Sequence, residues 1–343
     1  MHPSGRLILF GTRIGLNFSG GSNATVLLFQ HIVPFFEEVY IVCKELGALP
    51  FRGKVEVKFW STEDEAFKEL SKLSSADSVY YGDFVDAEIL VDANLPFFFT
   101  YHDNWPEQWD LDEASRSIAA ERIASYQKIF SAALEVFSVS EFKRNFIQTA
   151  TEKHRLIRNG SFHPIHASSQ TEIEEGTNFK LLMMGNLDKR KYRYAVELFE
   201  MMREDEGIDI HIYGHTVDHT IEENLRRFPF VHLKGFQANI DLSHYHLLLS
   251  TSFIENLPIS MLEALQNHTP VLSFEVGGIS ELVDQGETGV LIEPFEVKEM
   301  HTQLLKIKNA EYKFSFHPDR YEAFDWEKSA HLMLKQFRNY LHG

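Results

Sequence analysis

Cysteine and long hydrophobic runs are both scarce in this sequence. Cys43 is the single cysteine, so the chain forms no internal disulfide, and its apolar neighbours predict a small buried core residue. We therefore expect a reducing, cytoplasmic setting. Leu7 to Phe10 is too short for a signal-peptide core, and no stretch approaches the ~18 apolar residues of a membrane span. A soluble protein is expected, with any membrane contact peripheral and at the inner face.

Positive charge is also in deficit. Lysine and arginine number 33 against 50 aspartates and glutamates, a formal net charge of -17. Proteins that bind nucleic acid through its backbone neutralise phosphates with lysine and arginine, so we expect no nucleic acid among the partners. A Ser-His-Asp elbow and a phosphate-binding P-loop are absent too, which argues against those enzyme classes.

The chain is long enough for two domains, because single hydrophobic cores stop growing near ~250 to 300 residues. Short apolar runs alternate with helical patterns in both halves, and the runs are not polar at every second residue. That pattern predicts parallel sheets buried on both faces. In the first half the runs are Leu7 to Phe10, Val39 to Val42, Val55 to Trp60, Ile89 to Val91, Phe97 to Tyr101 and Val136 to Val139. In the second half they are Phe179 to Met184, Ile208 to Tyr213, Val231 to Phe236, Tyr245 to Leu249, Val271 to Phe274 and Gly289 to Ile292.

A polar stretch without periodicity, from Ser161 to Asn178, is interpreted as a linker. We therefore expect an α/β protein with two Rossmann-like domains that face each other across a cleft. The first covers residues 1–165 and the second residues 177–325, and an amphipathic helix follows over 326–343. Open α/β sheets bind ligands at the carboxyl ends of their strands, so function is expected in the loops that follow strands.

The most informative segment runs from Ser250 to Ala264. An apolar run leads into it, Glu255 falls in the following loop, and Pro258 suits the first turn of a helix because its missing N–H is not needed there. Glu263 then lies in the second turn. Free N–H groups at such a helix start suit an anion, and carboxylates beside it accept hydrogen bonds from hydroxyls. A nucleotide sugar, with a diphosphate between two hydroxyl-rich rings, requires that combination.

Glu255 and Glu263 are separated by seven residues, and the segment resembles the E-x7-E signature of the retaining GT-B glycosyltransferases of family 4. Alone, this spacing is more typical of a solvated helix face. Three downstream stretches are similar to the family's PV, GGxxE and TGxL elements, in the same order: Thr269 to Leu272, Gly277 to Val283 and Glu287 to Leu291. The resemblance implies that Glu255 contacts the donor sugar and Glu263 the ribose. Asn256, Leu257 and Pro258 join the expected donor-binding residues.

A basic loop follows the first apolar run of the second half. Met184 to Lys191 resembles the family's G-R-L-x-x-x-K loop, whose arginine and lysine neutralise the donor diphosphate. Lys191 falls on the lysine position, whereas Asn186 replaces the arginine. Losing one positive charge should reduce transition-state stabilisation. Lys189, Arg190 or Arg193 can supply the missing charge, or activity is reduced or absent. We include Asn186 and Arg190 among the donor-binding residues.

The first half resembles the family at two further places. Phe18 to Asn23 is similar to the family's glycine loop, where Gly20 and Gly21 permit close approach of a phosphate or an acceptor. A plain turn is the alternative. His102 follows an apolar run where the family has a histidine near the reacting centre, although a structural histidine also fits. Phe324 to Glu327 looks like the start of the family's crossover helix, which packs back on the first domain.

Metal sites are not expected. Asp110 and Asp112 form a D-x-D, but a helical run follows at once and acidic residues favour a helix N-terminus. His211, His215 and His219 recur every fourth residue, yet Gly214 interrupts them and they do not share a helical face.

Together these features predict a retaining, metal-independent glycosyltransferase that needs no cofactor beyond its nucleotide-sugar donor. Glu255, His102 and Lys191 are the predicted catalytic residues, and Gly21 and Glu263 complete the predicted donor-binding residues. The expected acceptor is a saccharide or lipid-linked saccharide of a surface polysaccharide. Two alternatives remain: a GT-B module without catalytic activity that serves as a binding or partner subunit, and a nucleotide-sugar epimerase.

Overall fold

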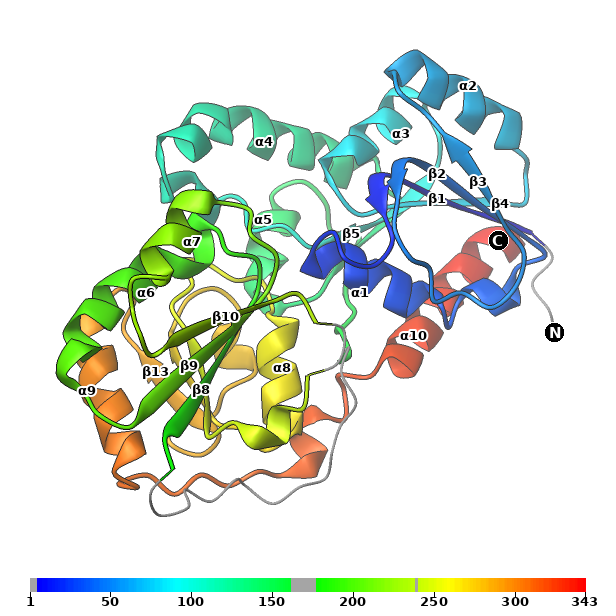
Figure 1. Cartoon of the computed structure of the whole chain (residues 1–343). Coiled ribbons are helices and arrows are strands. Elements are labelled where there is room, and N and C mark those ends of the chain that lie inside the picture. The colour runs from blue at the N-terminus through cyan, green and yellow to red at the C-terminus, as the bar shows by residue number, and fades with distance from the viewer. Residues whose placement is uncertain (1–4, 162–176, 238–239) are drawn as a thin grey trace. The chain divides into compact units, whose positions relative to one another are not determined.

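A computed structural model of the chain describes residues 5–161, 177–237 and 240–343 (Figure 1). Its internal contacts divide the chain into two units. The first unit comprises residues 1–160 and 323–343, and the second comprises residues 161–322. Most of the predicted linker, residues 162–176, lies outside the described residues.

The first unit is built on a parallel sheet with the strand order β3-β2-β1-β4-β5-β6-β7. Its strands are β1 (Arg6–Ile14), β2 (Glu38–Leu46), β3 (Val55–Phe59), β4 (Ser78–Gly82), β5 (Phe97–Tyr101), β6 (Glu135–Ser138) and β7 (His154–Leu156). Its helices are α1 (Gly20–Phe29), α2 (Glu63–Leu73), α3 (Glu88–Asp92), α4 (Glu113–Ala132), α5 (Arg144–Gln148) and α10 (Trp326–His342). Strands β4 and β5 are buried along their whole length, as a sheet covered on both faces requires.

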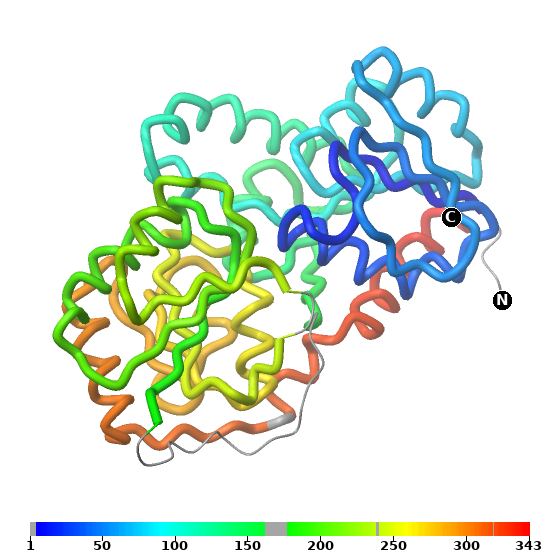
Figure 2. Tube along the Cα trace, in the orientation of Figure 1, coloured from blue at the N-terminus to red at the C-terminus, as the bar shows by residue number. Residues whose placement is uncertain are grey.

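The last helix of the chain belongs to this first unit. Helix α10 lies beside α1 in Figures 1 and 2, although some 300 residues separate them in sequence. The buried Phe337 of α10 packs its ring against Phe29 of α1 and Phe98 of β5, with centroids 6.4 and 4.8 Å apart. Ser329 Oγ also donates a 2.6 Å hydrogen bond to the carbonyl oxygen of Arg158. An aromatic core therefore joins both ends of the chain.

The second unit contains a parallel sheet with the strand order β10-β9-β8-β11-β12-β13. Its strands are β8 (Phe179–Met184), β9 (Ile208–Tyr213), β10 (Val231–Gly235), β11 (Leu247–Ser250), β12 (Val271–Phe274) and β13 (Gly289–Ile292). Its helices are α6 (Lys189–Met201), α7 (His219–Leu225), α8 (Ile259–Gln266) and α9 (Val297–Lys308). The α/β class with two Rossmann-like parallel-sheet domains is therefore confirmed.

Two local predictions were wrong. Residues 89–91 are not a strand but the middle of α3, with Ile89 and Leu90 buried. A short apolar run has the same pattern in a buried helix as in a buried strand, so periodicity cannot separate the two. The sheet position is taken by β4, which was not predicted. Pro258 is the N-cap residue of α8 and lies just before the first turn.

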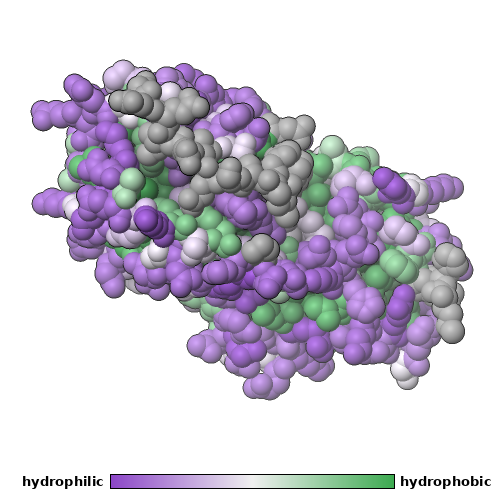
Figure 3. All heavy atoms as spheres, turned by 90° about the horizontal axis from the view of Figure 1, so that it is seen from below, coloured by the Kyte–Doolittle hydropathy of each residue, from purple (hydrophilic) through white to green (hydrophobic). Residues whose placement is uncertain are grey.

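On the face shown in Figure 3 hydrophilic residues predominate, and hydrophobic residues form scattered patches between them. Across the described residues, no helix combines the length and the apolar composition that crossing a bilayer requires. Cys43 is fully buried in β2, as its apolar neighbours predicted.

Candidate functional site

Two loops of the second unit bring a carboxylate and two cations together. Lys191 and Arg190 follow β8 in the first turn of α6, and Glu255 lies in the loop after β11. Strands β8 and β11 are neighbours and run parallel, so their carboxyl ends lie at the same sheet edge. This is the edge at which α/β sheets bind ligands.

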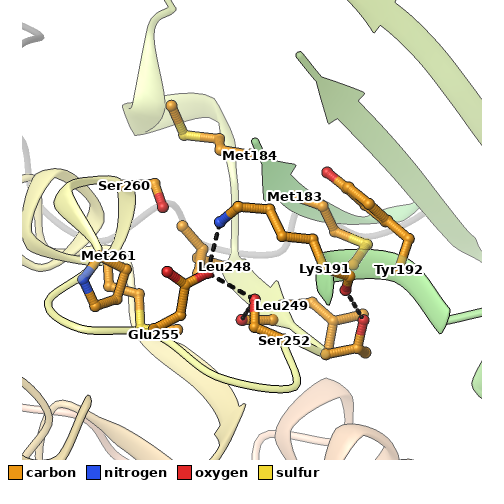
Figure 4. A pocket seen from close by; sticks show the side chains of 13 residues that line it. Met183, Met184, Lys191, Tyr192, Leu248, Leu249, Ser252, Glu255, Ser260 and Met261 are labelled. Atoms are coloured by element: carbon orange, nitrogen blue, oxygen red, sulfur yellow. Dashed lines mark hydrogen bonds and ion pairs between the residues drawn. The ribbon is translucent and has the colours of Figure 1, made fainter. Parts of the chain in front are cut away.

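Glu255 receives three polar contacts at one oxygen. Its Oε1 lies 2.6 Å from Lys191 Nζ, 3.0 Å from Arg190 Nη1 and 2.9 Å from the hydroxyl of Ser252. Figure 4 shows the Lys191 ammonium directed at the Glu255 carboxylate, with Ser252 close by. The Glu255 side chain is 10% exposed, so the ion pair with Lys191 is shielded from most of the solvent.

The two neighbouring cations keep the Glu255 carboxyl group ionised. Burial by itself would raise the pKa of Glu255, but Arg190 and Lys191 outweigh it and lower that pKa to about 2. The hydrogen bonds from Lys191 and Ser252 act in the same direction. Glu255 is therefore a carboxylate throughout the physiological range, able to accept hydrogen bonds and unsuited to donating a proton.

Backbone contacts hold the two loops against each other. Asp188 caps α6 by accepting a 3.0 Å bond from Lys191 N, which fixes where the helix begins. The amide of Phe253 donates to Arg190 O at 2.7 Å, and Thr251 Oγ1 donates to Lys191 O at 2.8 Å. The Arg190 guanidinium in turn donates to Ile254 O at 3.1 Å. The loop after β11 is thus bound to the first turn of α6.

Two glycines allow these loops to approach. Gly277 has φ +63°, and a Cβ there would lie 1.7 Å from the carbonyl oxygen of Glu255. The same oxygen accepts a 3.1 Å bond from Gly278 N. Gly185 has φ +136°, and a Cβ there would meet Lys191 Cδ at 2.4 Å. Both positions require glycine, for conformation as well as space.

The other predicted donor-binding residues of this unit differ in how they relate to the cluster of Glu255, Lys191 and Arg190. Pro258 lines the same small pocket as Lys191 and Glu255. Asn256 and Leu257 are buried in the loop, and the side chain of Glu263 is buried in α8 and does not line that pocket. Asn186 follows β8, half-buried, and its side chain makes no hydrogen bond to the described residues.

Gly21 and His102 lie together in the first unit. Strands β1, β4 and β5 are neighbours. Gly21 lies in the first turn of α1, which follows β1, and the loops after β4 and β5 carry Asp83 and His102. The predicted glycine loop is therefore shorter than expected, because α1 already begins at Gly20. A Cβ on Gly21 would lie 2.8 Å from Phe84 Cζ and 3.2 Å from His102 Cβ, so this glycine permits close packing. Thr25 Oγ1 lies 3.5 Å from His102 Nε2 and bonds Asp83 Oδ2.

Burial shifts both titratable groups of this second cluster toward their neutral forms. It lowers the pKa of His102 to about 4 and raises that of Asp83 to about 8. The hydrogen bond from Thr25 works against the shift of Asp83, whereas nearby Asp86 adds to it. At neutral pH His102 is therefore a neutral imidazole, with one ring nitrogen donating and the other accepting.

The sequence interpretation missed Ser252, Thr25, Asp83 and Phe84. Ser252 and Thr25 had a local signal, since each lies within one helical turn of a predicted residue. Asp83 and Phe84 follow β4, the strand that the pattern did not predict. Arg190 was one of three candidates for the missing positive charge, and it is the one that contacts Glu255.

The rival metal motifs have structural explanations. Asp112 caps α4 by accepting a 2.8 Å bond from Ser115 N, and Asp110 pairs with Arg116. His211 lies in β9 and His219 begins α7, so they share no face. Within the described ranges no three His, Cys, Asp or Glu side chains are grouped as a metal site would need.

Comparisons with known proteins extend these observations. Residues 178–309 match the family model described as glycosyl transferases group 1. The poly(ribitol-phosphate) alpha-N-acetylglucosaminyltransferase of Staphylococcus aureus (strain COL) is 31% identical over 187 residues, which are 51% of this chain and 36% of that protein. The chain thus spans about a quarter to a third of the length of the curated relatives it matches.

Solved structures show the same fold over the whole chain. A sucrose-phosphate synthase from Thermosynechococcus elongatus has a TM-score of 0.76 at 16% identity and covers 98% of both chains. HepE from Anabaena, in complex with UDP and glucose, has a TM-score of 0.71 at 15% identity over 97% of this chain and 99% of its own. The chain has the GT-B fold of these structures, and its residues 178–309 match the glycosyl transferases group 1 model.

Proposed function

We propose that this chain is a retaining, metal-independent glycosyltransferase that moves a hexose-type sugar from a nucleoside-diphosphate sugar to a saccharide hydroxyl. The observation that carries the proposal is the buried Glu255 carboxylate held by Lys191 and Arg190 at the carboxyl ends of β8 and β11. It lies inside the glycosyl transferases group 1 domain. The matched relative from Staphylococcus aureus is by its name also a glycosyltransferase.

In this proposal the donor rearranges the ion pair. Lys191 leaves Glu255 for the donor diphosphate, because two phosphate charges attract the ammonium more strongly than one carboxylate. Glu255 then accepts hydrogen bonds from the sugar hydroxyls, and Arg190 stays beside it and supplies the positive charge that Asn186 lacks. Glu263 holds the ribose hydroxyls, with Asn256, Leu257 and Pro258 forming the loop around the diphosphate.

The reaction exchanges one bond at the anomeric carbon for another. The bond from C1 to the diphosphate oxygen breaks, a bond from C1 to the acceptor oxygen forms, and the acceptor proton leaves with the diphosphate. Lys191 stabilises the negative charge that develops on that leaving group. Gly21 and His102 of the first unit contact the acceptor, and His102 accepts or donates a hydrogen bond there as a neutral ring.

The acceptor class rests on relatives. The Staphylococcus aureus protein is named as a poly(ribitol-phosphate) alpha-N-acetylglucosaminyltransferase. We extend this to a surface saccharide or lipid-linked saccharide as the acceptor, with the protein in the cytoplasm and in peripheral contact with the membrane.

A binding subunit without catalysis is the second candidate, and Asn186 favours it because the usual second cation of that loop is missing. The two candidates differ in a hydrolysis assay with a panel of UDP-, GDP- and ADP-sugars. An enzyme releases the diphosphate from one of them, and the anomeric configuration of its product is read by NMR. If the protein binds and hydrolyses none, the glycosyltransferase proposal is wrong. Isomerisation of the donor without acceptor would instead indicate an epimerase.

Lys191→Met tests the proposed role of the cationic loop. Turnover should fall by about 100-fold or more, as when one oxyanion-stabilising donor is removed. The fold should survive, because Arg190 still pairs with Glu255. Lys189→Met is the matched control, since Lys189 is the exposed neighbouring lysine at the start of the same helix. Equal turnover in the two variants would remove Lys191 from the mechanism.

A further inference from the structure

One threonine hydroxyl joins three parts of the first unit. Thr25 Oγ1 lies 3.1 Å from Gly21 O, 3.5 Å from His102 Nε2, and in hydrogen-bond contact with Asp83 Oδ2. Thr25 and Asp83 are 4% and 5% exposed, so water does not compete freely for these bonds. The contact with Gly21 O is the ordinary back-bond of a helical threonine. The contacts with Asp83 and His102 are not local, and helix formation does not explain them.

A hydroxyl has a single proton, which limits how the three groups can bond. When Asp83 is protonated, its acid proton goes to Thr25 Oγ1, and the Thr25 proton is free for Gly21 O or for His102 Nε2. When Asp83 is ionised, Thr25 donates to Asp83 and its oxygen can only accept from His102. An ionised Asp83 therefore leaves His102 Nε2 only the donor role toward Thr25, whereas a protonated Asp83 frees the Thr25 proton so that Nε2 can accept it.

The remaining ring nitrogen of His102, Nδ1, has no hydrogen-bond partner among the described residues. It takes whichever character Nε2 does not have, since a neutral imidazole has one donor and one acceptor. With Nε2 accepting from Thr25, Nδ1 bears the proton.

We propose that Thr25 and Asp83 are positioning residues that set the tautomer of His102 and so decide whether this histidine donates to or accepts from the acceptor substrate. The inference rests on the proposed function for its catalytic consequence, but the tautomer itself is a property of the free protein. It assigns a role to the buried Asp83 carboxyl, whose side chain faces Thr25 and lies near Asp86 and Tyr81.

The neutral form of Asp83 is the one expected near neutral pH, because burial raises its pKa to about 8. The nearest titratable neighbour, Asp86, is also a carboxyl group, so it provides no positive charge that would favour the ionised form of Asp83. Asp86 is itself buried and accepts a bond from Thr12 N. The geometry together with this charge state predicts His102 with its proton on Nδ1.

The test uses the whole chain and three threonine variants. Thr25→Val removes the hydroxyl and keeps the β-branched shape, and Thr25→Ser restores the hydroxyl. Thr100→Val is the matched control, because Thr100 is a buried threonine of β5 whose hydroxyl makes no hydrogen bond to Asp83 or His102. Nitrogen-15 NMR of the His102 ring reports the tautomer without any substrate.

In Thr25→Val the two His102 tautomers should become comparably populated. We expect kcat to fall by about 10-fold, which is less than the roughly 100- to 10,000-fold that a correctly positioned acid or base contributes. The donor KM should not change. Thr25→Ser should restore both the spectrum and kcat, and Thr100→Val should resemble the wild type. Where Thr25→Val does not fold, Asp83→Asn serves instead: its amide donates to Thr25 permanently, so the Nδ1–H tautomer should persist at every pH tested.

An unchanged His102 spectrum in Thr25→Val, or an Asp83→Asn protein with the proton on Nε2, would overturn the inference. The activity of His102→Ala separates this failure from a failure of the proposed function. If His102→Ala is fully active, the proposed contact of His102 with the acceptor is wrong. If His102→Ala is inactive while Thr25→Val keeps the wild-type kcat and spectrum, only the positioning role fails.

Discussion

Gly277→Ala tests how the second unit presents Glu255. The new Cβ would lie 1.7 Å from the Glu255 carbonyl oxygen, half of the 3.4 Å at which ordinary contacts begin. A non-glycine residue at φ +63° costs about 1–2 kcal/mol for its conformation. Displacing the Glu255 carbonyl also breaks its bond from Gly278 N, which adds about 1–3 kcal/mol.

The control for this variant is Gly286→Ala. Gly286 has φ +80°, so it pays the same conformational cost, but a Cβ there meets no atom within 4 Å. Gly277→Ala should therefore be less stable than Gly286→Ala by about 1–3 kcal/mol, the value of the lost hydrogen bond. Urea denaturation measures the stability difference. Calorimetric titration with nucleoside diphosphates measures the second effect, a weaker affinity in Gly277→Ala alone, because the loop that carries Glu255 has moved. Equal stability and equal affinity in the two variants would show that the close approach of these loops has no energetic role.

Two further predictions concern the charged groups. Gly185→Ala places a methyl group 2.4 Å from Lys191 Cδ and should displace the Lys191 ammonium from Glu255. Carbon-13 NMR of the Glu255 carboxyl should then show that its pKa has risen from about 2 toward the ordinary 4.5. An unchanged pKa would contradict the ion pair between Lys191 and Glu255. The raised pKa of Asp83 means that its contribution to stability is complete below 3.8 and is lost as pH rises through about 8. Asp83→Asn should remove that decline. The measurement is the free energy of unfolding of both proteins above pH 6.5, the ordinary pKa of His102, so that titration of this histidine does not contribute. Parallel pH curves for the two proteins would refute the prediction.

The second unit contains a buried carboxylate, Glu255, whose charge is maintained by cations in the first turn of α6. Burial of Glu255 without Lys191 and Arg190 would favour its neutral form, and a neutral acid would bind sugar hydroxyls differently. The first unit has the opposite arrangement: Asp83 is buried and His102 is partly buried, neither has a paired ion among the described residues, and the loss of solvent keeps both neutral at physiological pH. One sheet edge therefore presents fixed charges and the other presents neutral hydrogen-bonding groups.

Local sequence was sufficient for the outlines of both sheets, because a buried parallel strand is a short apolar run whatever its partners are. It was also sufficient to place Glu255 in a loop after a strand and His102 just beyond β5, whereas Lys191, expected in a loop, lies in the first turn of α6. It failed at residues 89–91, where the same apolar pattern forms α3. An apolar pattern of this length indicates that a segment is buried, but it does not distinguish a buried helix from a buried strand.

Only the tertiary structure decided which of these groups meet. Lys191 and Glu255 are 64 residues apart, and Thr25 and Asp83 are 58 apart. Their contacts exist because β8 pairs with β11 and β1 pairs with β4, pairings that skip intervening strands. Strand order is set by the packing of the whole sheet, and no single segment encodes it. The sequence by itself therefore determined which residues are available for chemistry. The order of the strands determined which of them are in contact, and these contacts determine their charge states.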